Sequence, residues 1–184
     1  RLSRQTLLLM GFGYIGKVTA QRAHALGMTV LAYDPFVTDE ATREFGAEKV
    51  DLDEGLARAD FVSVHVRLMP ETTGLVDLDL MRKMKPSAVL VNTARGNLVD
   101  EDALYDALKA NRICGAGLDV FAQEPLPTTS KLLELDNLVL SPHFSSQTVE
   151  SLWNTYKMAI DIADDFFQGR DCPHILNPEY KDAL

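Results

Sequence analysis

The sequence predicts an α/β fold in three layers, in which a doubly wound parallel sheet carries helices on both faces. Short apolar runs alternate along the chain with segments whose apolar residues recur at helical spacing, the order that produces parallel sheets. The runs are apolar almost throughout, as in strands that are buried on both faces. In such sheets, ligands bind outside the carboxyl ends of the strands.

The expected elements follow one another in a regular order. Strands are expected at 6–10, 29–33, 47–52, 60–66, 88–91, 113–120 and 138–140, and helices at 18–26, 38–45, 53–59, 77–84, 101–110 and 146–168. Asp53 and Asp100 are expected to cap the helices that follow them, and Gly169 to end the last helix. This last helix carries an apolar stripe that includes Trp153, and we expect the stripe to belong to the core or to an interface.

The segment Gly11-Phe12-Gly13-Tyr14-Ile15-Gly16 joins the first apolar run to the first helical segment. In a strand–loop–helix unit, the first glycine permits the tight turn and the second lets the backbone approach a pyrophosphate. The third lets the helix pack closely on the strand. The free N–H groups at the start of that helix then face the phosphates. The glycine pattern alone is also compatible with an ordinary turn.

Asp34 ends the second apolar run, 18 residues beyond Gly16. An acid about 20 residues after the glycines typically binds the adenosine ribose of a dinucleotide. The glycines and the acid together favour a Rossmann-type nucleotide-binding domain over a purely structural turn.

Five polar residues each follow a different apolar run: Asp34, His65, Arg95, Asp119 and His143. Arg95 is a candidate for binding a substrate carboxylate through two parallel hydrogen bonds, the alternative being a surface ion pair. His143 is a candidate general acid/base, the alternative being a packed histidine.

The remaining candidates are less specific. Glu124 lies in a proline-rich loop and is either an ordinary loop charge or, if it contacts His143, a group that favours the imidazolium. Asp119 could merely end a strand, and for His65 a hydrogen bond to the backbone is expected unless a ligand is bound. Cys114 is expected to be buried and inert.

Composition narrows the class of protein. The 184 residues, 46% of them hydrophobic, suffice for one domain with a sizeable core, and the net charge of −9 argues against nonspecific binding to nucleic acid or to anionic membranes. The two cysteines have no metal-like spacing, so no metal is expected, and they suggest a reduced, cytoplasmic setting. No membrane span or signal peptide is visible, and the start at Arg1 suggests a cut or processed end.

Several motifs resemble those of the NAD-binding domain of the D-isomer-specific 2-hydroxyacid dehydrogenases, of the phosphoglycerate dehydrogenase and hydroxypyruvate reductase type. The resemblance covers about residues 6–178 and rests on the blocks Gly11–Gly16, Tyr33-Asp34-Pro35, Asn92-Thr93-Ala94-Arg95-Gly96, Gly117–Phe121, Glu124-Pro125 and Ser141-Pro142-His143. It implies one NAD-binding domain over 1–184, with its core at about 5–170. A tail at 171–184 would lead toward a substrate domain that this chain lacks.

The resemblance also implies roles for individual residues. Arg95 would bind the substrate's carboxylate and carbonyl, His143 would be the acid/base, and Glu124 would be its partner. Tyr14 and Ile15 would lie on the pyrophosphate, Val66 and Thr72 near the adenosine and ribose, and Asp119 and the Thr93 region toward the nicotinamide. The implied cofactor-binding set is Gly11, Gly13, Tyr14, Ile15, Gly16, Asp34, His65, Val66, Thr72, Thr93, Ala94, Arg95, Asp119, His143, Ser145 and Ser146.

At three places the chain departs from the family's usual pattern. Arg67 and Met69 stand where Pro and Thr are usual, and Ser145-Ser146 replaces a pair rich in Gly or Ala. A cation at position 67 could reach a phosphate and so favour NADP, whereas the Asp34 carboxylate would repel a 2′-phosphate and favour NAD.

The function implied is hydride transfer between NAD(H) and the C2 atom of a D-2-hydroxy acid or 2-oxo acid. A homodimer is expected, and the isolated chain is expected to be inactive. The alternative is an NAD(H)-sensing binding module of the corepressor type, because that branch of the family keeps the same motifs. Which 2-hydroxy acid is used does not follow from the sequence.

Overall fold

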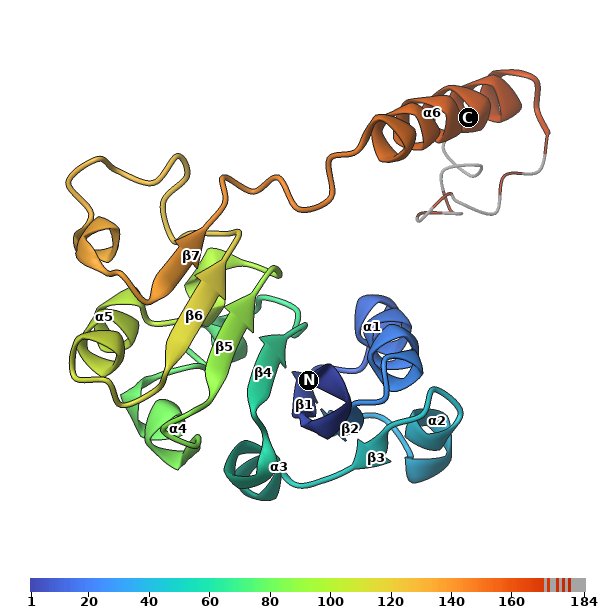
Figure 1. Cartoon of the computed structure of the whole chain (residues 1–184). Coiled ribbons are helices and arrows are strands. Elements are labelled where there is room, and N and C mark those ends of the chain that lie inside the picture. Colours follow the sequence, from blue (N-terminus) through green and yellow to red (C-terminus); the bar gives the residue numbers. More distant parts are fainter. Residues whose placement is uncertain (171, 173–174, 176, 178, 180–184) are drawn as a thin grey trace. The chain divides into compact units, whose positions relative to one another are not determined.

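The computed structural model describes residues 1–170, 172, 175, 177 and 179. The chain divides into two compact units, Arg1–Ser145 and Ser146–Leu184. The first unit contains all the described strands, and the second contains the helix α6 (Val149–Phe167) (Figure 1). The expectation of a single domain over 1–184 stays a prediction, and most of the predicted tail at 171–184 lies outside the described residues.

The first unit is built on a seven-stranded sheet in which every neighbouring pair of strands is parallel. The strands are β1 (Thr6–Met10), β2 (Thr29–Tyr33), β3 (Glu48–Lys49), β4 (Phe61–Val64), β5 (Val89–Asn92), β6 (Gly115–Leu118) and β7 (Leu138–Leu140). Their order is β3-β2-β1-β4-β5-β6-β7, so the chain moves outward from the centre in both directions. The reversal point between β1 and β4 is where such sheets bind ligands.

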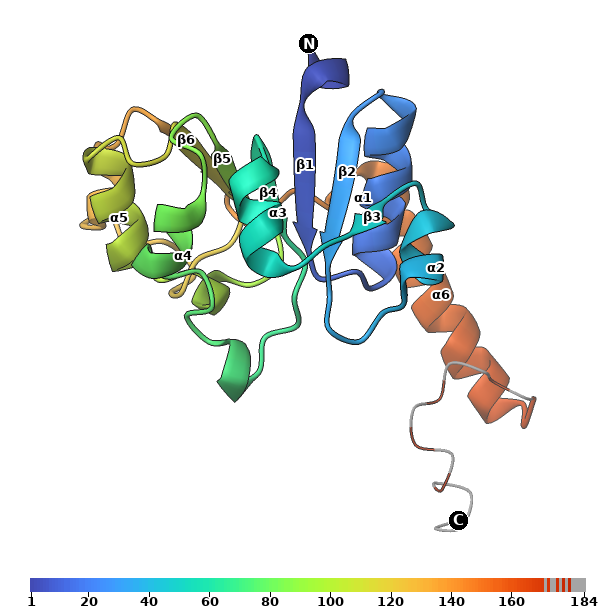
Figure 2. The same ribbon diagram turned by 90° about the horizontal axis from the view of Figure 1, so that it is seen from below.

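Both faces of the central strands are covered. Alternate side chains of β1 enter two different hydrophobic clusters, Leu7 and Leu9 in one and Leu8 and Met10 in the other. Helix α1 (Tyr14–Ala25) packs into the first cluster, and α3 (Leu52–Arg58), α4 (Leu78–Lys83) and α5 (Glu101–Lys109) pack into the second (Figure 2). The three-layer, doubly wound architecture predicted from the sequence is confirmed.

Several element boundaries differ from the predicted ones, and at α3 the reason is a wrongly predicted cap. Helix α3 begins after Asp51, not Asp53, and Asp53 lies in the first turn, where its carboxylate is 2.7 Å from the Lys83 ammonium. Asp100 does cap α5, because its carboxylate accepts the N–H groups of Asp102 and Ala103. Helix α2 (Asp39–Arg43) is capped by Thr38 and is shorter than expected.

The apolar stripe of α6 is not part of a core. No side chain of this helix is buried, and Trp153 is 69% exposed. The prediction of a core role is therefore wrong for the described residues, and the alternative of an interface stays a prediction. Gly169 follows the helix with φ +66°, the left-handed conformation of a helix stop.

Two further findings concern residue exposure and hydropathy. Cys114 is exposed rather than buried as expected, because its neighbour Ile113 is the residue that fills the core at this point. Among the described helices, none is both long and apolar enough to cross a membrane.

Candidate functional site

The turn after β1 has the shape that its glycines predict. Gly11 has φ +94°, and its N–H donates to the Tyr33 carbonyl at 2.8 Å. A Cβ atom at position 11 would lie 2.7 Å from the carbonyl of His65, and one at position 16 would lie 2.5 Å from the Gly11 oxygen. Glycine is therefore required at 11 by the turn and at 16 by the close approach of α1 to the strand.

Gly13 differs from these two glycines. A Cβ atom at this position would meet nothing within 4 Å, so packing within the chain does not require glycine here. Gly13 is the N-cap of α1 and makes no side-chain cap, while Tyr14 and Ile15 are 86% and 65% exposed. The first turn of α1 thus offers uncapped N–H groups and open space, the properties of an anion-binding helix terminus.

Asp34 ties the end of β2 to this turn. One carboxylate oxygen accepts the Phe12 N–H at 2.8 Å, and the other accepts the Phe36 N–H at 2.9 Å. The half-buried carboxylate is therefore fixed in direction and keeps free lone pairs, as a ribose-binding acid requires.

A cavity of about 330 Å³, which we call the Asp34 pocket, lies beside this carboxylate. It brings together six of the predicted cofactor residues with six that were not in the predicted set. Its lining consists of Gly11, Gly13, Tyr33, Asp34, Pro35, Phe36, His65, Val66, Arg67, Met69, Thr72 and Leu75.

Two polar residues of this lining have partners within the chain. The His65 ring nitrogen Nε2 lies 3.0 Å from the Ser63 hydroxyl, a side chain rather than the backbone group expected, and burial lowers the pKa of the imidazole. The Thr72 hydroxyl accepts the Met69 N–H at 2.8 Å and lies 2.8 Å from the Arg67 carbonyl oxygen, so it closes the turn 67–72.

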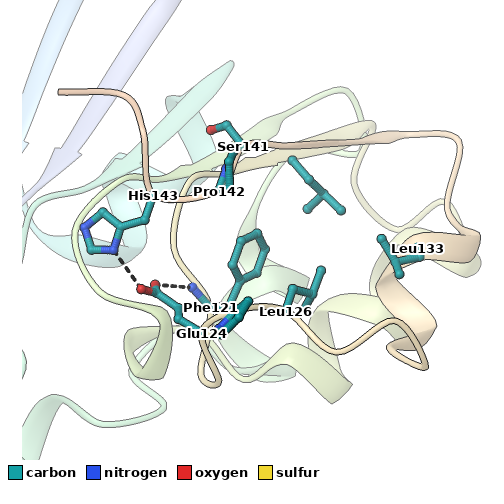
Figure 3. Close-up of a pocket in the computed structure, with 9 residues that line it drawn as sticks. Phe121, Glu124, Leu126, Leu133, Ser141, Pro142 and His143 are labelled. Carbon is teal, nitrogen blue, oxygen red and sulfur yellow. Dashed lines mark hydrogen bonds and ion pairs between the residues drawn. The ribbon is translucent and has the colours of Figure 1, made fainter. Parts of the chain in front are cut away.

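The second group of candidates meets after β5, β6 and β7. His143 Nδ1 lies 2.8 Å from a Glu124 carboxylate oxygen, and the other oxygen accepts the Phe121 N–H at 3.1 Å (Figure 3). The hydrogen bond with His143, followed by that from Phe121, holds the pKa of the Glu124 carboxyl below its usual range. The contact that the sequence could not establish is therefore present.

The backbone at Arg95 is held by Asn92, a buried residue of the same motif block for which the sequence predicted no role. The Asn92 side chain, fully buried at the end of β5, accepts the Ala94 N–H at 3.0 Å and donates to the Arg95 carbonyl at 2.9 Å. The Arg95 guanidinium is exposed and donates to the Ala94 carbonyl at 2.6 Å. Its positive charge also lowers the pKa of Glu124, and among the described residues it forms no ion pair within 4.0 Å.

Asp119 anchors the loop that carries His143. Its buried carboxylate accepts the Ser141 and Ser145 hydroxyls and the N–H groups of Phe144 and Ser145, at 2.5–3.2 Å. Burial raises the pKa of this carboxyl, but the four donors outweigh burial and hold the pKa well below its usual range. The role visible in the structure is thus to shape the loop, in which His143 has the unusual φ of +55° for a residue other than glycine.

Two predicted residues add little to this geometry. Thr93 is exposed. Ser146 belongs to the second unit, so its expected place beside the nicotinamide stays a prediction.

A second cavity, of about 570 Å³, borders the His143–Glu124 pair. We call it the Leu133 pocket. Most of its lining is apolar, with Phe121, Leu126 and Leu133 facing Pro142 in Figure 3. This pocket was not predicted from the sequence, because its walls come from a loop and from the edge strand β7.

A protein family and several known proteins are similar to this chain over the residues that form the site. The family described as "D-isomer specific 2-hydroxyacid dehydrogenase, NAD binding domain" matches residues 1–145. The chain is 43% identical over 175 residues to the glyoxylate reductase of Korarchaeum cryptofilum, covering 95% of this chain and 53% of that protein. It is 48% identical over 147 residues to the D-3-phosphoglycerate dehydrogenase of Mycobacterium bovis, covering 80% and 28%.

A solved structure shares the fold. It is the NAD-complexed D-isomer-specific 2-hydroxyacid dehydrogenase of Lactobacillus delbrueckii ssp. bulgaricus, with a TM-score of 0.87 and 32% identity over 96% of this chain and 57% of that one. The chain thus spans about half the length of two of these proteins and about a quarter of the third.

These three relatives have the names of oxidoreductases, and they give no support to the corepressor alternative. The family match covers most of the chain, and it includes the glycine turn, Asp34, Arg95, Glu124 and His143. The chain therefore belongs to the NAD-binding domain family of the D-isomer-specific 2-hydroxyacid dehydrogenases.

Proposed function

We propose that this chain is the cofactor-binding part of an enzyme that moves a hydride between NAD(H) and C2 of a D-2-hydroxy acid or 2-oxo acid. The observation that carries the proposal is the 2.8 Å contact between His143 and Glu124. This pair follows strands of the same parallel sheet whose β1–α1 turn offers an uncapped helix N-terminus. An acid–base pair and an anion site at one sheet edge suit a dinucleotide-dependent reaction.

In the direction of reduction, the substrate carbonyl gains a hydride at carbon and a proton at oxygen. A bound NADH would supply the hydride, and His143 would supply the proton. Because Nδ1 of His143 is hydrogen-bonded to Glu124, the other ring nitrogen, Nε2, is the one that would face a substrate oxygen. In the direction of oxidation, the same nitrogen takes the hydroxyl proton.

Arg95 supplies the charge that fixes the substrate. Its exposed guanidinium would bind the substrate carboxylate through two parallel hydrogen bonds and so place C2 beside the nicotinamide.

The cofactor would lie along the carboxyl edge of the sheet. Its pyrophosphate would rest on the N–H groups at Gly13, Tyr14 and Ile15, and its adenosine ribose on the free lone pairs of Asp34. The adenine would enter the Asp34 pocket against Val66, and the nicotinamide would lie near the loops that contain Thr93 and Ser145.

Titration calorimetry of this chain with NADH and NADPH tests the cofactor assignment. We expect NADH to bind more tightly, because the Asp34 carboxylate repels a 2′-phosphate more than the exposed Arg67 attracts it. Equal or tighter binding of NADPH would overturn the choice of NAD, and failure to bind either cofactor would overturn the proposed function.

A turnover assay compares the rate of 2-oxo acid reduction by the full-length protein with the rate by this chain alone. The match to the glyoxylate reductase extends over only 53% of that protein, so about half of that relative has no counterpart in this chain. Substrate positioning and exclusion of water supply much of an enzyme's rate. We expect the full-length protein to reduce members of a 2-oxo acid panel and this chain to do so at least about a hundredfold more slowly. Comparable rates would contradict the proposal.

We also propose a homodimer in the cytoplasm. The exposed apolar residues of α6, among them Trp153 and Ile160, support an interface, and the two free cysteines support a reducing compartment. Sedimentation of the full-length protein as a monomer at micromolar concentration would exclude the dimer.

A further inference from the structure

The loop that carries Glu124 is also held from outside, by a residue of α5. Glu101 begins α5, and its carboxylate oxygen Oε1 accepts the N–H of Ala122 at 2.7 Å. The next amide toward the N-terminus, that of Phe121, donates to Glu124. Two neighbouring N–H groups of one loop are therefore held by two carboxylates, one on α5 and one within the loop.

The same peptide group is fixed on its other side by a steric contact. A Cβ atom at Gly96 would lie 1.9 Å from the carbonyl carbon of Phe121 and 2.4 Å from the nitrogen of Ala122. Gly96 directly follows Arg95, so the segment that carries the guanidinium presses against the peptide that Glu101 binds. The Phe121–Ala122 peptide thus has one polar and one steric restraint, and both lie outside its own loop.

We propose that Glu101 is a positioning residue for the acid–base pair: by binding the Ala122 amide it keeps the Phe121 amide on Glu124, and Glu124 on His143. The inference rests on the proposed function of that pair. Glu101 touches neither His143 nor Glu124 and acts only through the Phe121–Ala122 peptide.

The competing explanation is that Glu101 merely stabilises α5, because an acidic residue in the first turn of a helix interacts favourably with its dipole. Asp102 provides a matched control for this effect. It lies in the same first turn, and its carboxylate pairs with Lys131 at 2.8 Å rather than with the loop.

Substitutions at position 101 separate the effect of side-chain length from the effect of charge. Glu101→Gln keeps an oxygen that can accept the Ala122 amide but loses the charge. Glu101→Asp keeps the charge at the helix terminus but is one methylene too short to keep the 2.7 Å contact. A positioning role therefore predicts a defect in Glu101→Asp and in Glu101→Ala and near-normal behaviour in Glu101→Gln, whereas a helix-dipole role predicts the opposite order for Asp and Gln.

The experiment is nuclear magnetic resonance on this chain, with two readouts. In Glu101→Ala and Glu101→Asp, we expect amide hydrogen exchange at Ala122 to accelerate at least tenfold. We also expect the pH midpoint of the His143 ring signals to move toward the value in Glu124→Gln. Glu101→Gln and Asp102→Ala should leave both readouts near the wild-type values.

The charges around the ring set what the second readout reports. Glu124 contacts the ring directly, Arg95 acts on Glu124, and Asp119 binds the backbone beside His143. None of these three is altered in the position 101 variants. Glu101→Gln removes the same charge as Glu101→Ala, so a midpoint that changes in Glu101→Ala and Glu101→Asp but not in Glu101→Gln reports the displacement of Glu124.

Wild-type exchange and midpoints in a folded Glu101→Asp protein would overturn the proposal, as would equal changes in Asp102→Ala. If Glu101→Ala unfolds, the comparison of Glu101→Asp with Glu101→Gln still decides. These readouts need no turnover, so a failure of the proposed dehydrogenase activity would be seen separately, in the cofactor titration and the rate assay.

Discussion

Two regions at the same edge of the sheet are built by different means. The nucleotide turn, residues 11–16 with Asp34, is shaped by backbone conformation and close contacts, because a side chain at Gly11 or Gly16 would collide with backbone atoms. The acid–base cluster, which consists of Arg95, Asp119, Glu124 and His143, is shaped by hydrogen bonds between loops that are far apart in the sequence.

This difference predicts different responses to substitution. In the nucleotide turn, a changed glycine alters the backbone itself, so folding and cofactor binding should suffer. In the acid–base cluster, a shortened side chain at Arg95 or His143 removes a chemical group from a loop that Asn92 or Asp119 still holds. Chemistry should then change while the fold and cofactor binding persist.

The largest effect is expected at His143. In the full-length enzyme, His143→Ala removes the proton donor, and general acid–base catalysis typically contributes about 10²–10⁴-fold. We expect kcat to fall by about that factor while calorimetry gives an NADH affinity within about twofold of wild type.

Exposed His24 on α1 supplies the control for this prediction. His24→Ala should leave kcat unchanged. Near-normal turnover in His143→Ala would remove the acid/base assignment, and a parallel loss of NADH binding would remove the distinction between the two regions.

A pair of glycine substitutions tests the nucleotide turn. Gly11→Ala places a side chain at φ +94° and 2.7 Å from the His65 carbonyl, and the left-handed conformation alone costs about 1–2 kcal/mol. Gly13→Ala meets no protein atom but adds a methyl group where the proposal puts the pyrophosphate. We expect Gly11→Ala to melt several degrees lower, and Gly13→Ala to melt normally but bind NADH at least tenfold more weakly.

Circular dichroism melts and NADH titration of this chain check both variants. If Gly13→Ala binds NADH normally, the cofactor does not approach this turn. If Gly11→Ala melts normally, the turn is less constrained than its geometry indicates.

The same contrast explains what could be predicted from the sequence. The requirement for glycine in a turn depends on the local backbone conformation. The spacing of Gly11, Gly13 and Gly16 was therefore enough to place the turn between β1 and α1. The runs that became β1 and β2 were also predicted at their observed bounds, because largely buried apolar strands have an unambiguous pattern. The bounds of the edge strand β7 were predicted as well, although Val139 at its centre is exposed.

The supports of the acid–base cluster are long-range and were not predictable in the same way. Glu124 and His143 could be nominated, but their contact spans 19 residues and depends on the path of an irregular loop. No role was predicted for Asn92, although it stands in one of the motif blocks, or for Glu101, because a polar residue after a strand or at a helix start has many ordinary roles. Likewise, Asp51 and Asp53 compete for one helix start, and only the fold decides between them.

Arg95 allows a smaller and more selective change. Arg95→Lys keeps the positive charge but replaces the planar fork of the guanidinium by a single ammonium, so one of two parallel hydrogen bonds to a carboxylate is lost. In the full-length enzyme we expect KM for the 2-oxo acid to rise by about tenfold, with less change in kcat and none in NADH affinity.

Lys109, exposed at the end of α5, offers the matched control, and Lys109→Arg should leave KM unaltered. An unchanged KM in Arg95→Lys would place the substrate carboxylate elsewhere.

The smallest expected effect, a change in pH dependence, is also the most specific for the acid–base pair. The lowered pKa of the Glu124 carboxyl, due first to its hydrogen bond with His143, means that Glu124 is ionised throughout the neutral range. A negative partner 2.8 Å from Nδ1 favours the protonated ring, which is the form that donates a proton in reduction. Glu124→Gln removes this charge and keeps the size, so the proton-donating form should be lost at lower pH. The alkaline limb of the reduction profile should move to lower pH, the acidic limb of the oxidation profile should move the same way, and melting at neutral pH should change little.

Glu44→Gln is the control for this prediction. It removes the same charge at an exposed position after α2, far from Glu124 in the sequence, and should leave both limbs in place. A Glu124→Gln profile that coincides with wild type would show that the 2.8 Å contact has no part in proton transfer.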